Sequence, residues 1–93
     1  MNEIQEIAVR QHIEAQCDKV KQLLLEKNAK YGNSALEPLR IFSKAGAIDG
    51  IRVRIDDKLC RIANGNTGGD EDTVLDLIGY LVLYRIGLEM GIE

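Results

Sequence analysis

A run of apolar residues near the end of the chain constrains the fold most. Between Val74 and Ile86, large aliphatic side chains fall on nearly every side of a helix instead of along one stripe. They are Val74, Leu75, Leu77, Ile78, Leu81, Val82, Leu83 and Ile86. A helix that is apolar all round must be covered on more than one side. The sequence therefore predicts a last helix, from about residue 70 to 90, that other helices or a second subunit cover.

Two other long segments have the three-to-four-residue apolar spacing of amphipathic helices. The first runs from about residue 3 to 30, and the turn-forming sequence 32–34 ends it. The second runs from about 49 to 64, with Asp49 as the expected N-cap. The alternation over residues 51–55 would also suit a strand, but helical spacing continues beyond it, which favours a helix.

A short helix is also predicted, from about 37 to 44, because Pro38 would stand at its first position. Residues 64–69 then form a glycine-rich linker, and the acidic residues 70–72 suit the first turn of the last helix. The predicted fold is an all-α, single-domain bundle over residues 1–93. It has three main helices plus a short one, and we expect self-association to complete it as a dimer or tetramer.

Composition excludes several classes of protein. The chain has 93 residues, of which 45% are hydrophobic, so one folded domain is expected. A net charge of −3 argues against general binding of duplex DNA, which requires a cationic excess. The uncharged apolar stretch 77–84 is far shorter than the roughly 20 residues of a membrane span. The first residues lack the features of a secretory signal, so a cytoplasmic location is expected.

The two cysteines, Cys17 and Cys60, both lie within apolar helical patterns. They are far apart in the sequence, and the chain contains no Cys-x-x-Cys motif. We therefore expect buried structural thiols in preference to a disulfide, metal ligands or a nucleophile.

A polar line interrupts the apolar last helix. Asp72, Asp76 and Tyr80 are spaced four residues apart and share one face. Asp76 lies a full turn inside the helix, so burial of its charge requires a cation. The preceding helix offers a charged stripe that could face it, made of Arg54, Asp57, Lys58 and Arg61. The arrangement is either a salt-bridge network between helices or a site for Mg²⁺ and phosphate.

Three segments, in this order, resemble the nucleotide modification associated domain 1 family, whose short members are frequent in phages and prophages. They are Lys27-x-x-Lys30-Tyr31-Gly32-Asn33-Ser34, Arg54-Ile55-Asp56-Asp57-Lys58-Leu59-x-Arg61-Ile62 and Glu71-Asp72-Thr73-x-x-Asp76-Leu77-x-x-Tyr80. That family is similar to the MazG-like all-α nucleoside triphosphate pyrophosphatases. The resemblance covers about residues 20–85 and implies a bacterial host or a phage-infected cell.

The resemblance implies a Mg²⁺-dependent cleavage of nucleoside triphosphates. In MazG-like enzymes, two pairs of carboxylates on two helices bind the metal. Asp72 and Asp76 would form one pair here, at a spacing of four residues instead of three. Glu26 would belong to the other pair, but Leu23 stands where its partner is expected, and Asp57 is the candidate replacement.

The catalytic set implied in this way is Glu26, Asp57, Asp72 and Asp76, and the metal ligands are Glu26, Asp72 and Asp76. The phosphate-binding cations would be Lys30, Arg54, Lys58 and Arg61. Two tyrosines would stack on a base or orient a carboxylate, namely Tyr31 and Tyr80. Two alternatives stay open. The chain could bind a nucleotide or a nucleotide signal without hydrolysing it, or it could be a helical interaction module without a ligand.

Overall fold

The computed structural model describes residues 1–66 and 72–93, and its regular elements there are all helices. Helix α1 spans Glu3–Tyr31, α2 spans Ala47–Ala63 and α3 spans Thr73–Glu89. The predicted all-α fold class is confirmed, and residues 51–55 are helical as expected. None of these helices combines the length and the apolar character that a bilayer-spanning segment requires.

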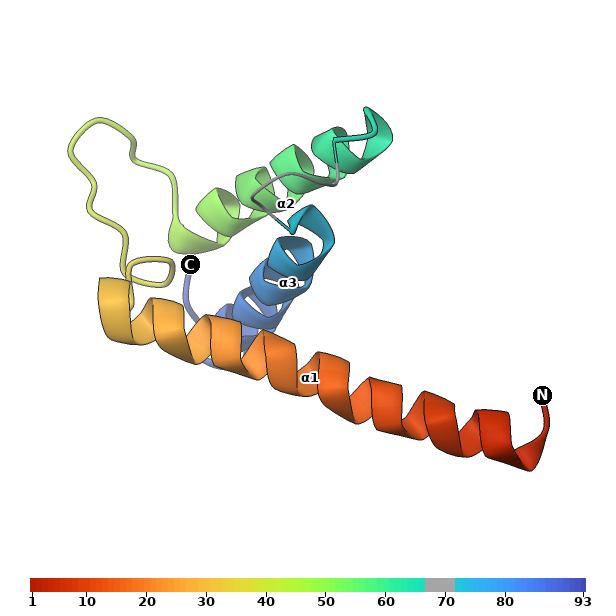
Figure 1. Ribbon diagram of the computed structural model, residues 1–93. Helices are drawn as coiled ribbons and strands as arrows, with labels where there is room; N and C mark the ends of the chain where they lie inside the picture. The colour runs from red at the N-terminus through yellow and green to blue at the C-terminus, as the bar shows by residue number, and fades with distance from the viewer. Residues whose placement is uncertain (67–71) are drawn as a thin grey trace.

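Helix α3 is the element on which the other two pack (Figure 1). Leu24 of α1 lies over Gly79, and Ile48 of α2 lies against Gly87. The backbones of α1 and α2 do not approach each other closely within the described ranges. The last helix is therefore covered on two sides, as its apolar circumference predicts. The N-terminal half of α1 extends away from both neighbours (Figure 1).

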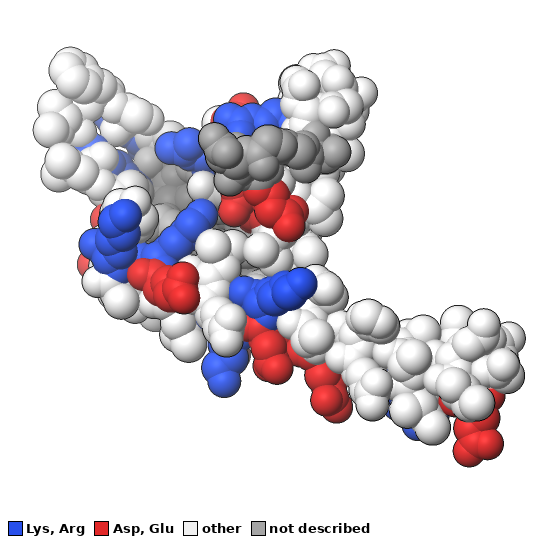
Figure 2. All heavy atoms as spheres, in the orientation of Figure 1, with Lys and Arg blue, Asp and Glu red and all other residues white. Residues whose placement is uncertain are grey.

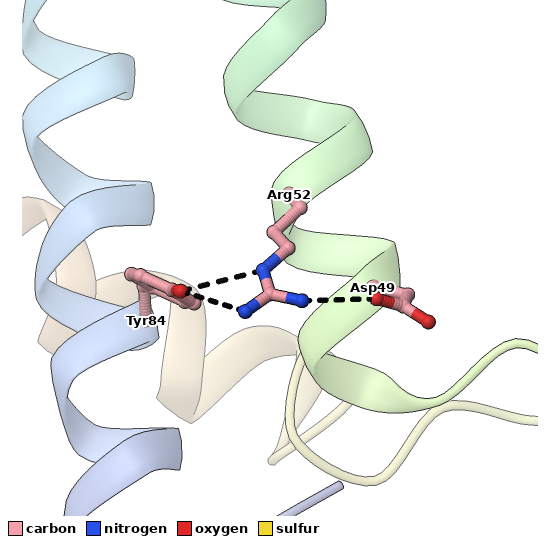
Figure 3. A network of polar contacts seen from close by, with 3 residues as sticks. All are labelled: Asp49, Arg52 and Tyr84. Atoms are coloured by element: carbon pink, nitrogen blue, oxygen red, sulfur yellow. Dashed lines mark hydrogen bonds and ion pairs between the residues drawn. The ribbon is translucent and has the colours of Figure 1, made fainter.

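A polar cluster also joins α2 to α3, on the exposed side of their contact (Figure 3). The Arg52 guanidinium donates to the Tyr84 hydroxyl from Nε at 3.3 Å and from Nη2 at 3.0 Å, and Nη1 donates to Asp49 at 3.3 Å. The bonds to Tyr84, followed by those to Asp49, raise the pKa of Arg52. An arginine is already protonated at every ordinary pH, so Arg52 stays positively charged in this contact throughout the working range.

Two helix starts differ from the predicted ones. Helix α2 begins at Ala47 with Gly46 as its N-cap, and Asp49 is instead an acidic residue within the first turn. The earlier start buries Ala47 and Ile48, which favours it over a start at Asp49. Helix α3 begins at Thr73, and Asp72 is its N-cap. The predicted extension to Asp70 and Glu71 lies outside the described residues.

The predicted short helix over residues 37–44 is wrong, because this segment has no helical turn. Its apolar side chains do not pack on the bundle, and Phe42 is 98% exposed. A helix of two turns is unstable in water without tertiary packing, so a proline at the first position is not sufficient. The Ser43 hydroxyl instead accepts from the Ala45 amide at 3.1 Å, a local bond that competes with helix formation.

The prediction of buried cysteines is also wrong, since Cys17 and Cys60 are both exposed and free. Cys17 lies on an exposed side of α1. Cys60 lies on a side of α2 that the bundle does not cover. Helical spacing identifies an apolar face but does not show whether a neighbour covers it.

Gly46 provides the first testable prediction. A Cβ added there would overlap the carbonyl oxygen of Glu93, which accepts a hydrogen bond from the Ile48 amide. Because the conflicting atoms belong to the backbone, we expect Gly46→Ala to lower the free energy of unfolding by about 1–3 kcal/mol. Thermal unfolding followed by circular dichroism measures the change.

Gly50 is the matched control, because it lies in the same helix and a Cβ there meets nothing within 4 Å. Gly50→Ala should stabilise the protein by about 0.5–1 kcal/mol through helix propensity. Equal effects of the two substitutions would contradict the proposed contact with Glu93.

Candidate functional site

A cavity of about 300 Å³ lies between the C-terminal end of α1, the turn that follows it and one face of α3. Leucine side chains form its apolar wall, from Leu23, Leu24, Leu36 and Leu83. Its polar wall combines one cation, one carboxylate, amides and phenols, namely Lys27, Asp76, Asn28, Asn33, Tyr31 and Tyr80. The volume is at the lower end of the range for small-molecule sites, so the cavity suits one small, partly apolar ligand.

Asp76 is the central charged group of this cavity, and lysines from both other helices contact it. Lys58 of α2 lies with its Nζ 3.5 Å from Oδ2, and Lys27 of α1 lies with its Nζ 3.6 Å from Oδ1. The side chains of Asp76 and Lys58 are only 11% and 8% exposed. The prediction that Asp76 requires a cation from the preceding helix is confirmed, because Lys58 supplies it.

Lys27 differs from Lys58 in its exposure. Half of the Lys27 side chain is exposed, and it forms part of the cavity wall. Because Lys58 already pairs with Asp76, neutralising this carboxylate does not require the Lys27 ammonium. An ammonium has three donors, and both separations exceed the distance of a strong charge-assisted hydrogen bond. Lys27 can therefore offer donors to a ligand while it stays near Asp76.

The turn after α1 places amide groups beside this ammonium. The Asn28 Nδ2 donates to Oδ1 of Asn33 at 2.8 Å and to the carbonyl of Gly32 at 3.2 Å. These bonds orient the Asn33 side chain, whose own nitrogen has no hydrogen-bond partner within the described part of the chain. That nitrogen is a second donor at the cavity wall.

The two predicted tyrosines also line the cavity, from different helices. Tyr80 lies one turn after Asp76 on α3, as the polar line in the sequence indicates. Tyr31 is the last residue of α1, and the Lys30 Nζ lies 5.2 Å from the centre of its ring. Lys30 therefore contacts Tyr31 and is not part of the cavity wall. Each phenol ring offers a surface suited to contact with a planar group of a ligand.

Asp72 has a structural role at the start of α3. Its Oδ1 accepts from the Leu75 amide at 2.9 Å, which caps the helix. Asp72 and Asp76 therefore lie one turn apart, but their carboxylates have different partners. One oxygen of Asp72 is directed to the amides of its own helix, and both oxygens of Asp76 face lysines.

The structure does not place the other predicted residues in the cavity wall. Glu26 is exposed on α1, and Arg54, Asp57 and Arg61 are exposed on α2. Within residues 1–66 and 72–93, no three acidic, histidine or cysteine side chains converge on a position for a metal ion. Asp76 instead faces lysines and Asp72 caps α3, and the Mg²⁺ site of Glu26, Asp72 and Asp76 stays a prediction from the sequence.

Sequence reasoning missed the contribution of Lys27. Its position carries a usable signal, because Val20, Leu24, Lys27 and Tyr31 follow one another at spacings of four, three and four. Lys27 thus occupies the face of α1 that packs on α3, where an apolar residue is expected. A cation on the inner face of one helix and a carboxylate on the inner face of another indicate a pair.

Comparison of the chain with protein-family models found no match, and comparisons with characterised proteins and with solved structures found none either. The class that the fold and the cavity define is an all-α protein with a small, partly charged pocket between α1 and α3. The resemblance to the nucleotide modification associated domain 1 family stays a prediction from the sequence.

The contact of Asp76 with two lysines predicts an order of stability among variants. We expect Asp76→Ala to lower the free energy of unfolding by about 2–4 kcal/mol, because it removes the carboxylate that faces the buried Lys58. Asp72→Ala should cost about 1 kcal/mol, the usual effect of losing an N-cap. Chemical denaturation of both variants measures the difference.

Asp57→Ala is the control for these variants, because Asp57 is an exposed acid on α2. It should change stability by less than about 0.5 kcal/mol. A loss for Asp72→Ala equal to that for Asp76→Ala would show that the lysine contacts contribute little.

Proposed function

We propose that this protein binds a nucleotide or a nucleotide-derived small molecule through its phosphate in the cavity between α1 and α3. The observation that carries the proposal is the half-exposed Lys27 ammonium at the wall, beside a carboxylate that Lys58 already pairs. An anion can approach this ammonium without meeting an unpaired negative charge. The Asn33 amide adds a neutral donor at the same end.

The rest of the wall suits the other part of such a ligand. Tyr31 and Tyr80 provide phenol rings against which a base can pack, and the leucines provide an apolar surface. A volume of about 300 Å³ favours a mononucleotide over a dinucleotide. The sequence resemblance to nucleotide-processing proteins supports the same class of ligand.

The arrangement favours binding without hydrolysis over the Mg²⁺-dependent pyrophosphohydrolase that the resemblance implies. Hydrolysis of that kind uses several carboxylates around a metal ion. Here the carboxylates of Glu26, Asp57 and Asp72 lie outside the cavity wall, and Asp76 is paired with lysines. We therefore assign no step of the chemistry to a bound metal.

Titration calorimetry with nucleoside mono-, di- and triphosphates, with and without Mg²⁺, tests this proposal. We expect binding of at least one nucleotide. Chromatography of the solution in the calorimeter cell should then recover that nucleotide intact, both with and without Mg²⁺. Release of a monophosphate in the presence of Mg²⁺ would establish the hydrolase instead, and Asp57→Asn would then test whether Asp57 replaces the missing carboxylate.

Lys27→Gln should weaken nucleotide binding about 10- to 100-fold, because it removes one charge-assisted contact worth about 1.5–3 kcal/mol. Lys21→Gln is the control, since Lys21 is an exposed lysine of the same helix outside the cavity wall. Unchanged affinity in Lys27→Gln would place the phosphate elsewhere. A loss with Lys30→Gln alone would favour the assignment implied by the resemblance.

A further inference from the structure

The chain exposes more surface than a folded monomer of its size. Its accessible surface is 7361 Å², whereas a compact monomer of 10.4 kDa exposes roughly 5,400 Å². Its radius of gyration is 15.8 Å, against about 12 Å for a compact domain of this length. The excess is about 2,000 Å² per chain, well above the roughly 800 Å² that each partner buries in a standard interface.

Part of this surface is the N-terminal half of α1, which we call the arm and define as residues 3–17. Val9, Ile13 and Cys17 follow one another at spacings of four, and the stripe continues with Val20 and Leu24. Val20 is buried and Leu24 packs on Gly79 of α3, whereas Ile13 is 56% exposed. Figure 2 shows the arm as a largely uncharged surface on the side in view. The stripe that packs on α3 within one chain thus continues without a covering element.

The second uncovered surface is the outer face of α3. Four of its residues share one side at spacings of four, three and seven, and all four are exposed, namely Val74, Ile78, Leu81 and Leu88. Leu81 lies near the middle of this face and is 44% exposed. Arg85 is also on this side and is its one charged member between residues 74 and 88. An apolar helix face of four turns is unusual on a monomer.

We propose that two copies of this chain form a reciprocal dimer in which the arm of each copy packs on the outer face of α3 of the other. Each chain carries both surfaces, so a dimer with a two-fold axis covers both arms and both outer faces of α3 at once. Within one chain, the same stripe of α1 already packs on another face of α3, where Leu24 lies over Gly79. The lengths also agree, because the arm (residues 3–17) and the outer face of α3 (residues 74–88) each extend about 21 Å along their helices at 1.5 Å per residue.

The uncovered area is large enough for a second copy. The excess of about 2,000 Å² per chain, part of which lies on the arm and the outer face of α3, is more than the roughly 800 Å² that each partner buries in a standard interface. On the side in view, most charged side chains lie where the helices meet, and those on the arm lie along its lower edge and at its end (Figure 2). The dimer therefore covers the apolar surfaces and leaves the cavity between α1 and α3 to its ligand.

Light scattering coupled to size exclusion, at micromolar concentration, tests this arrangement. We expect wild type to have about twice the 10.4 kDa mass of one chain. Ile13→Asp and Leu81→Lys should each yield monomers, because each introduces an unpaired charge at the middle of one face. An equimolar mixture of the two variants should recover the dimer. In this mixed dimer, one contact between an arm and α3 is native, and the other brings the introduced aspartate to the introduced lysine.

Ala15→Asp is the matched control, since Ala15 is exposed on α1 but lies off the stripe, and it should leave the dimer unchanged. Circular dichroism checks that each variant keeps its helices, and Ile13→Gln or Leu81→Gln replaces a variant that does not. A wild type that is monomeric at every concentration overturns the proposal. So does a dimer that Leu81→Lys dissociates and Ile13→Asp does not, because α3 would then pair with α3.

Discussion

The structure depends on one carboxylate inside an apolar helix. Asp76 lies in α3 among residues that are mostly aliphatic, and it is paired with a lysine from each of the other helices. Leaving such a charge unpaired would cost several kcal/mol, so a neighbouring helix must present a cation at the level of Asp76; Lys58 of α2 does so, and Lys27 of α1 reaches the same carboxylate. This requirement sets how the helices align along α3, which apolar contacts alone would not do. Apolar packing is non-directional, whereas an ion pair fixes a position.

The same contact links the fold to the candidate site. Lys58 is buried with Asp76 between α2 and α3, and Lys27 reaches the carboxylate from the cavity side. The pair that stabilises the bundle therefore presents one ammonium to the cavity and neutralises the negative charge that would repel an anion. The proposed binding of a phosphate agrees with this arrangement, because the carboxylate oxygens of Asp76 already face cations.

The architecture leaves much of the chain uncovered. Within residues 1–66 and 72–93, α1 and α2 pack on α3, and the arm of α1 is exposed along its apolar stripe at Val9 and Ile13. In a chain of 93 residues the area available for a core is small, so a second copy is a physically reasonable source of further burial. The exposed segment around Phe42 belongs to the same pattern, since its apolar side chains also remain outside the bundle.

The sequence by itself determined the helical class, the three long helices and the need of Asp76 for a cation. Periodicity and burial cost are properties of neighbouring residues along one helix, so they can be inferred without the fold. Only the tertiary structure decided which faces are covered. It exposed Cys17 and Cys60, left residues 37–44 without a helix and kept Glu26 and Asp57 out of the cavity. It also brought Lys27 to Asp76, because a contact between helices depends on how they cross and not on spacing within either one.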